Sequence, residues 1–237
     1  MAKASEFENH CWKDMFSKEL IEQSSIYVRD TLVGDKPGLL LVDLYNFVYD
    51  GGNRPVHEVE KEYSLACGEY AWNAIEPTKR LIAAARAAKI PIIYSTRKVD
   101  TGATVSTKSQ KRRPRKPDAY DIWPDFAPQP GDTIVYKERA SVFYGTPMIA
   151  KLNHLGVRSL IVCGESTSGC VRNTVQDAYM NGYHVSIVEE CTYDRNIVCH
   201  KVNLFDMHHK YADVMNVDEV IAHLNGLAGQ LALAKAG

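Results

Sequence analysis

The chain has 237 residues, 45% hydrophobic and 24% charged, which fits one large α/β domain with a sizeable core. Its 28 basic and 29 acidic residues nearly cancel, so no bulk field attracts nucleic acid or a membrane surface. No apolar stretch approaches the ~20 residues of a membrane span. The first six residues lack an apolar signal core, and the six cysteines lack a disulfide or zinc spacing. We therefore expect a cytoplasmic protein with free thiols.

The N-terminal part differs in composition from the rest of the chain. Residues 5–30 are rich in Glu, Lys, Leu and aromatic side chains, with apolar positions at roughly helical spacing. We predict a helical arm over residues 1–36, followed by a single domain over residues 37–237. The arm packs either on its own domain or on a neighbouring subunit, and the sequence does not decide between the two.

Strand and helix patterns alternate along the remainder of the chain. Short apolar strands are predicted over residues 38–44, 90–95, 132–137, 159–162, 184–188 and 213–217. Helices are predicted over residues 74–89, 146–155, 200–211 and 218–227, and from Cys170 to Gly182. This alternation predicts an α/β fold: a doubly wound, mostly parallel sheet with helices on both faces.

Two segments are predicted to be loops that border the carboxyl ends of the strands, over residues 45–64 and 189–195. A third polar segment, residues 99–118, contains the basic run from Lys108 to Lys116. We interpret it as a solvated loop, with closure over an anionic substrate as the alternative.

Three side chains with complementary chemistry follow predicted strands. Asp43 and Lys137 end the first and third strands, and Cys170 lies in the turn after the fourth. The carboxyl ends of parallel strands share one edge of the sheet, which is where such folds bind ligands. A helix N-terminus and a nearby ammonium favour the nucleophilic thiolate. Asp43 is suited to take the thiol proton. The alternatives are a plain ion pair between Asp43 and Lys137 and a structural cysteine.

These residues lie in segments that resemble the isochorismatase-like cysteine hydrolases, and most closely their N-carbamoylsarcosine and maleamate amidohydrolase branch. The matching segments are Leu40 to Asp43, Lys137, Ser141 to Thr146, Thr167 to Arg172, Asp194-Arg195, Asn203 to Met207 and Lys210 to Asp213. The resemblance extends from about Gly38 to Val217. It implies a six-stranded parallel sheet and a catalytic triad of Asp43, Lys137 and Cys170.

The resemblance also implies roles for the residues around the triad. A cis peptide bond before Ser166 would direct the backbone N–H of Ser166, with that of Cys170, toward an oxyanion. Arg195 would bind a substrate carboxylate, its alternative being an ion pair with Asp194 or Glu190. Thr167 is a further candidate for substrate binding. The resemblance suggests a homo-oligomer, a dimer or a tetramer.

Two features depart from the family pattern. Glu165 stands where relatives often carry an uncharged residue, so it either points away from the sulfur or serves the substrate amide. His57 lies in the loop after Asp43 without the Asp-x-His pattern of metal-binding relatives, and His208-His209 is interpreted as a solvated pair. We therefore expect no metal.

The sequence thus predicts a cysteine amidohydrolase without a cofactor. It is expected to release ammonia from a small carbamoyl compound or primary amide bearing a carboxylate, through a thioester. Its partner is a small molecule, with no nucleic acid and no membrane. Two alternatives stay open. One is an isochorismatase-type vinyl ether hydrolase, and the other is a non-catalytic interaction module with the family fold.

Overall fold

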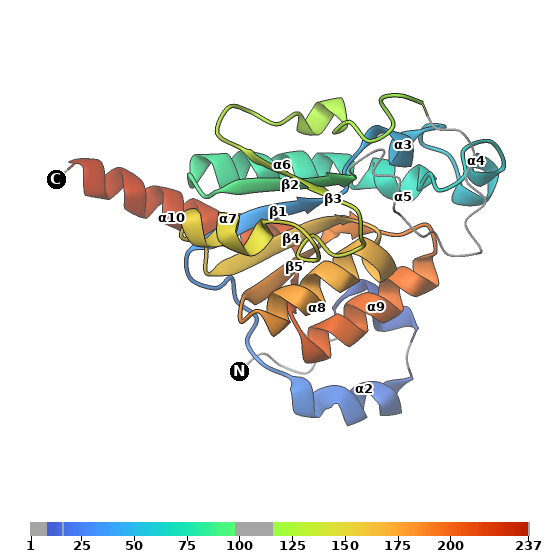
Figure 1. The fold of residues 1–237 in the computed structure, drawn as a ribbon. Coiled ribbons are helices and arrows are strands. Elements are labelled where there is room, and N and C mark those ends of the chain that lie inside the picture. Colours follow the sequence, from blue (N-terminus) through green and yellow to red (C-terminus); the bar gives the residue numbers. More distant parts are fainter. Residues whose placement is uncertain (1–8, 16, 98–115, 237) are drawn as a thin grey trace.

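A six-stranded sheet forms the centre of the molecule (Figure 1). The computed structural model describes residues 9–15, 17–97 and 116–236, with side chains to residue 232. The strands are β1 (Pro37–Val42), β2 (Ile92–Arg97), β3 (Thr133–Lys137), β4 (Ser159–Glu165), β5 (His184–Tyr193) and β6 (Asp213–Met215). Their order is β3-β2-β1-β4-β5-β6, and every neighbouring pair is parallel. The predicted doubly wound parallel sheet is therefore confirmed.

Helices cover both faces of the sheet (Figure 1). The helices are α2 (Lys18–Ser24), α3 (Asn46–Tyr49), α4 (Val56–Glu62), α5 (Gly68–Asn73), α6 (Ile75–Ala87), α7 (Met148–His154), α8 (Arg172–Met180), α9 (Ile197–Lys210) and α10 (Val217–Ala236). Single 3₁₀ turns occur at Cys11–Asp14, Ser25–Tyr27 and Pro124–Phe126, and a π-helical turn at Thr167–Val171. Within the described residues, no helix combines the length and apolarity that crossing a membrane requires.

Two hydrophobic cores lie on opposite faces of the sheet, because successive strand side chains point to opposite sides. Leu39 and Leu41 of β1 pack in the core that α6 and α10 cover. Leu40 and Val42 of the same strand pack in the core that α7, α8 and α9 cover. All six residues of β1 are buried, as expected for a central strand of a parallel sheet.

Two of the predicted loops contain regular structure. Residues 45–64 hold the short helices α3 and α4, and residues 189–193 continue β5. In β5 the pairing with β4 shifts register, from Val162 opposite Ile187 to Gly164 opposite Thr192. The polar pair Glu189-Glu190 falls inside this irregular stretch, which explains why the apolar pattern of the strand ends early. The basic run from Lys108 to Arg115 lies outside the described residues.

The described part of the N-terminal arm packs against its own domain. Trp12 is 1% exposed, and its ring forms a T-shaped contact with Phe205 on α9 at a centroid distance of 5.8 Å. Glu189 of β5 accepts a hydrogen bond from the backbone N–H of Cys11 at 2.8 Å, and its other oxygen lies 2.6 Å from His10 Nδ1. The arm residues before residue 9, and residue 16, lie outside the described ranges.

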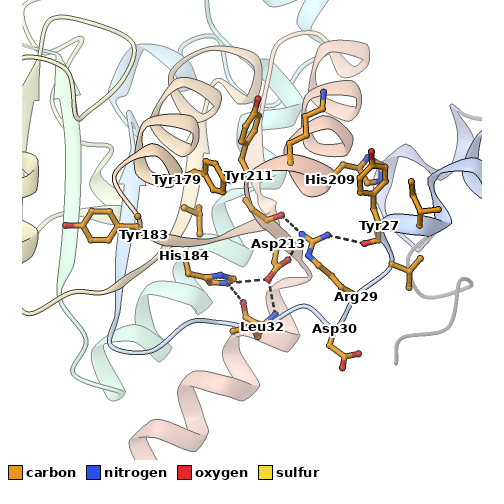
Figure 2. Close-up of a pocket in the computed structure, with 16 residues that line it drawn as sticks. Tyr27, Arg29, Asp30, Leu32, Tyr179, Tyr183, His184, His209, Tyr211 and Asp213 are labelled. Atoms are coloured by element: carbon orange, nitrogen blue, oxygen red, sulfur yellow. Dashed lines mark hydrogen bonds and ion pairs between the residues drawn. The ribbon is translucent and has the colours of Figure 1, made fainter.

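A surface pocket of about 670 Å³ lies where the arm crosses the amino ends of β5 and β6 (Figure 2). Asp213 in its lining lies 2.6 Å from Arg29 and 3.3 Å from His184. Asp213 also accepts a hydrogen bond from the backbone N–H of Leu32 at 3.3 Å. The pocket is at the edge of the sheet opposite the carboxyl ends of the strands, so these contacts attach the arm to the domain.

Candidate active site

Asp43, Lys137 and Cys170 meet at the carboxyl edge of the sheet. Asp43 directly follows β1, Lys137 is the last residue of β3, and Cys170 lies in the π-helical turn after β4. The Nζ atom of Lys137 is 2.7 Å from Asp43 Oδ2 and donates a hydrogen bond to Cys170 Sγ over 3.3 Å. The structure therefore brings together three residues that are 127 positions apart at their extremes (170 − 43).

Lys137 is held as a fully bonded ammonium. It is 5% exposed, and its third hydrogen bond goes to the backbone carbonyl of Arg139 at 3.2 Å. All three N–H donors of the ammonium thus have an acceptor. Burial lowers the pKa of Lys137, but the charges and hydrogen bonds of Asp43 and Cys170 outweigh it, and the net pKa is raised. Lys137 therefore keeps its proton across the physiological range.

Asp43 is positioned by a serine that the sequence analysis did not single out. The Asp43 carboxylate is 1% exposed, and its Oδ1 accepts a hydrogen bond from Ser95 Oγ at 2.8 Å. Asp43 has a φ of +57°, a left-handed conformation that Asp tolerates better than most residues. Ser95 lies near the carboxyl end of β2, so the rule that located the triad applies to it as well.

Cys170 lies in a wide helical turn that leaves its residue partly exposed. The N–H of Val171 donates to the carbonyl of Ser166 at 3.1 Å, an i to i+5 bond of the kind often found at functional sites. Burial raises the pKa of the Cys170 thiol, Asp43 raises it further, and Lys137 opposes them. The expectation of a depressed thiol pKa is therefore wrong.

The turn that carries Cys170 is tied to β5 and α9. Asp194 Oδ2 accepts hydrogen bonds from the backbone N–H and the hydroxyl of Ser168, at 2.9 and 2.6 Å. On α8, Arg172 donates to Asn203 at 2.5 Å and to Asp206 at 2.8 Å, which joins α8 to α9. These bonds fix the nucleophile relative to the sheet. They also give a structural role to Asp194, Asn203 and Asp206, which lie in segments that carry the family resemblance.

The peptide bond between Glu165 and Ser166 is cis, as the family resemblance implies. Gly164 precedes it with a φ of +118°, and a Cβ atom there would lie 2.0 Å from the carbonyl oxygen of Val42. No other residue fits between β1 and β4 at this point. The oxyanion role of the backbone N–H groups of Ser166 and Cys170 stays a prediction.

The two predicted substrate-binding residues have different environments. Arg195 is exposed, and within the described residues it forms no ion pair with Asp194 or Glu190, whose carboxylates accept from Ser168 and from the N–H of Val217. Thr167 is fully buried, and its Oγ1 lies 2.8 Å from His200 Nδ1. Thr167 thus anchors the turn to α9, and its part in substrate binding stays a prediction.

No metal-binding cluster of three His, Cys, Asp or Glu side chains occurs in the part of the chain that the structure describes. His57 is 75% exposed on α4, 4.0 Å from Glu58. His208 was interpreted as solvated, and this is wrong. It is 2% exposed, and its Nδ1 accepts a hydrogen bond from the backbone N–H of Val214 at 3.0 Å.

Fold and site together define a class: a doubly wound parallel α/β protein with cysteine, lysine and aspartate at the carboxyl edge of its sheet. The isochorismatase domain model matches residues 37–219, so the chain belongs to the isochorismatase family. It is 39% identical over 103 residues to maleamate amidohydrolase of Pseudomonas putida, a match covering 44% of this chain and 48% of that protein. The match therefore spans about half the length of that relative.

Two further comparisons agree with the family and the fold. The chain is 30% identical over 204 residues to N-carbamoylsarcosine amidase of an Arthrobacter species, covering 82% of this chain and 73% of that protein. A cysteine hydrolase structure from Pseudomonas syringae pv. phaseolicola superposes with a TM-score of 0.69 at 19% identity. It covers 84% of this chain and 100% of that one, and it shows the shared fold.

Proposed function

We propose that the protein is an amidohydrolase that uses Cys170 to release ammonia from a small primary amide or carbamoyl compound bearing a carboxylate. The observation that carries the proposal is the position of the Lys137 ammonium, 2.7 Å from Asp43 and 3.3 Å from Cys170 Sγ. A buried base, a buried cation and a thiol in contact are the parts that nucleophilic acyl transfer requires. Relatives named as maleamate amidohydrolase and N-carbamoylsarcosine amidase support the substrate class.

In the first half of the reaction, Asp43 takes the thiol proton as Cys170 Sγ attacks the substrate carbonyl. The C–S bond forms, and the carbonyl π electrons move onto oxygen, where the N–H groups of Ser166 and Cys170 stabilise the oxyanion. Lys137 stabilises negative charge on sulfur during the proton transfer. The oxyanion then collapses, the C–N bond breaks, and Asp43 returns its proton to the departing nitrogen as ammonia leaves.

In the second half, Asp43 accepts a proton from water, whose oxygen attacks the thioester carbonyl. The C–S bond breaks, and the sulfur regains its proton from Asp43. An amide thus becomes a carboxylic acid, and a carbamoyl group becomes a carbamic acid that loses carbon dioxide. The exposed guanidinium of Arg195 binds the substrate carboxylate bidentately and orients the carbonyl toward the sulfur.

The test measures ammonia release from N-carbamoylsarcosine, N-carbamoylglycine and maleamate by wild type, Cys170→Ala and Cys199→Ala. Cys199 is a second partly exposed cysteine, on α9, and serves as the matched control. We expect release by wild type and Cys199→Ala, and none by Cys170→Ala. Intact-protein mass spectrometry of wild type under turnover should show an acyl adduct on Cys170.

Other results would contradict the proposal. Retained ammonia release in Cys170→Ala would refute the mechanism. Turnover of isochorismate, with the amides untouched, would favour the vinyl ether hydrolase. No turnover of any compound by a folded protein would favour a non-catalytic module.

A further inference from the structure

Glu165 is a buried acid at the carboxyl edge of the sheet that the proposed mechanism does not use. It ends β4 and is 8% exposed. Among the described residues, Glu165 Oε2 accepts a hydrogen bond from the thiol of Cys67 at 4.0 Å. A thiol is a weak donor, whereas buried carboxyl oxygens normally have strong ones. The carboxyl group of Glu165 can therefore form hydrogen bonds beyond the one with Cys67.

Glu165 ends β4, which lies between β1 and β5 in the sheet. Asp43 directly follows β1, and Arg195 comes two residues after Tyr193, the register partner of Glu165 on β5. Val42 of β1 and Gly164 of β4 are the last register partners of these two adjacent strands. Asp43 directly follows Val42 in the chain, and Glu165 directly follows Gly164. The carboxyl group interacts electrostatically with Asp43, Lys137 and Arg195. A substrate whose carbonyl meets Cys170 and whose carboxylate meets Arg195 must therefore present its middle to Glu165.

The charge state of Glu165 suits an anionic substrate. Burial and the charge of Asp43 raise its pKa to about 8, against the lowering effects of Arg195 and Lys137. At neutral pH the group is mostly a neutral acid, which accepts and donates hydrogen bonds without repelling a carboxylate. Glu165 also interacts electrostatically with Tyr45, Tyr49, Cys67, Cys170, Tyr193 and Asp194.

We propose that Glu165 binds an N–H group located between the reacting carbonyl and the carboxylate of the substrate. The inference rests on the proposed function and narrows its substrate class to ureido acids whose internal nitrogen carries a hydrogen. Such a compound is an N-carbamoyl derivative of a primary amino acid. A methyl group on that nitrogen removes the donor and leaves the carboxyl of Glu165 without its partner.

The test compares N-carbamoylglycine with N-carbamoylsarcosine, which differ by that single methyl group. The kcat/KM for ammonia release at pH 7 is measured with wild type, Glu165→Gln, Glu165→Leu and the control Glu190→Gln on β5. The ratio of the two kcat/KM values cancels the concentration of active enzyme, so partial unfolding of a variant does not affect it. A purely structural role of Glu165 would leave the ratio unchanged.

Wild type and Glu190→Gln should prefer the N–H substrate by about tenfold or more, the effect of one unpaired buried polar group. Glu165→Gln keeps the acceptor oxygen and should keep the preference within about threefold of wild type. Glu165→Leu should reduce the preference to about twofold or less.

Release of ammonia from both compounds with an unchanged ratio in Glu165→Leu overturns the inference and leaves the proposed function standing. A wild-type preference for the methylated compound, or turnover of maleamate alone, also overturns the inference and leaves the proposed function standing. Absence of ammonia release from all three compounds overturns the proposed function, and the inference with it.

Discussion

The ammonium of Lys137 lies 2.7 Å from the carboxylate of Asp43, and the two side chains are 5% and 1% exposed. A charge buried to this extent is tolerated only with its partner, because the protein interior solvates an isolated ion poorly. The pair therefore has a structural as well as a chemical role.

Lys137→Met should abolish turnover and lower the free energy of unfolding by about 3–5 kcal/mol, because it leaves Asp43 buried without its cation. Lys201→Met is the matched control: Lys201 pairs at 2.6 Å with Asp14, whose side chain is 70% exposed. Such an exposed pair contributes little to the free energy of unfolding, so this variant should stay close to wild type in stability. The double variant Asp43→Asn/Lys137→Met should lose less stability than the sum of its single changes. Urea unfolding measures the changes in stability, and ammonia release measures turnover. If the stability losses of the single variants add up in the double variant, Asp43 and Lys137 are not coupled.

Ser95 should matter for catalysis through Asp43. Ser95→Ala removes the hydrogen bond to Asp43 Oδ1 and should lower kcat about tenfold, with a stability loss of about 1.5–3 kcal/mol. Ser186 is equally buried, and its Oγ donates to the carbonyl of Leu32 at 2.9 Å, away from the triad. Ser186→Ala should lose about 1 kcal/mol and keep its kcat. Ammonia-release kinetics and urea unfolding of both variants check this, and equal kcat values would contradict the positioning role.

Gly164 should be the least replaceable glycine among those with a positive φ. Gly164→Ala combines an unfavourable φ with a Cβ 2.0 Å from the oxygen of Val42, and should cost about 3 kcal/mol or more. Gly182 also has a positive φ, +82°, but a Cβ there has open space around it. Gly182→Ala should cost only about 1 kcal/mol. Thermal unfolding of the two variants distinguishes them, and similar midpoints would mean that β1 and β4 separate easily.

Much of the fold was predictable because buried parallel strands are continuous apolar runs. The run over residues 38–44 and its counterparts located all six strands, and the residues that follow them located Asp43, Lys137 and Cys170. The short helices α3 and α4 were missed because four to seven residues give little periodicity. The end of β5 was missed because Glu189-Glu190 interrupts its pattern.

The electrostatics of the site was less predictable than its composition. The pKa of Cys170 depends on how deeply the sulfur lies and on how near Asp43 is, and a sequence specifies neither quantity directly. Glu165 is a similar case: its neighbours Cys67 and Arg195 come from segments almost 130 residues apart (195 − 67). Sequence reasoning recognised it as a departure from the family pattern but did not determine its protonation state.

The raised pKa of Glu165, about 8, has a consequence for stability that can be measured. In the unfolded chain a glutamate ionises near its usual pKa of about 4.3, so between roughly pH 4.5 and 8 the folded protein binds the extra proton. Stability then falls as pH rises, by up to ~1.4 kcal/mol per pH unit from this group, and the effect levels off above pH 8. Glu165→Gln lacks this titration.

The variant should therefore gain stability relative to wild type by up to about 3–4 kcal/mol between pH 5 and pH 8. Other groups that titrate in this range, the histidines above all, are shared by both proteins and cancel in the difference. Urea unfolding of wild type and Glu165→Gln at the two pH values gives that difference directly. If the gap between the two proteins were the same at pH 5 and pH 8, Glu165 would be ionised at both, and the site would carry a second negative charge beside Asp43.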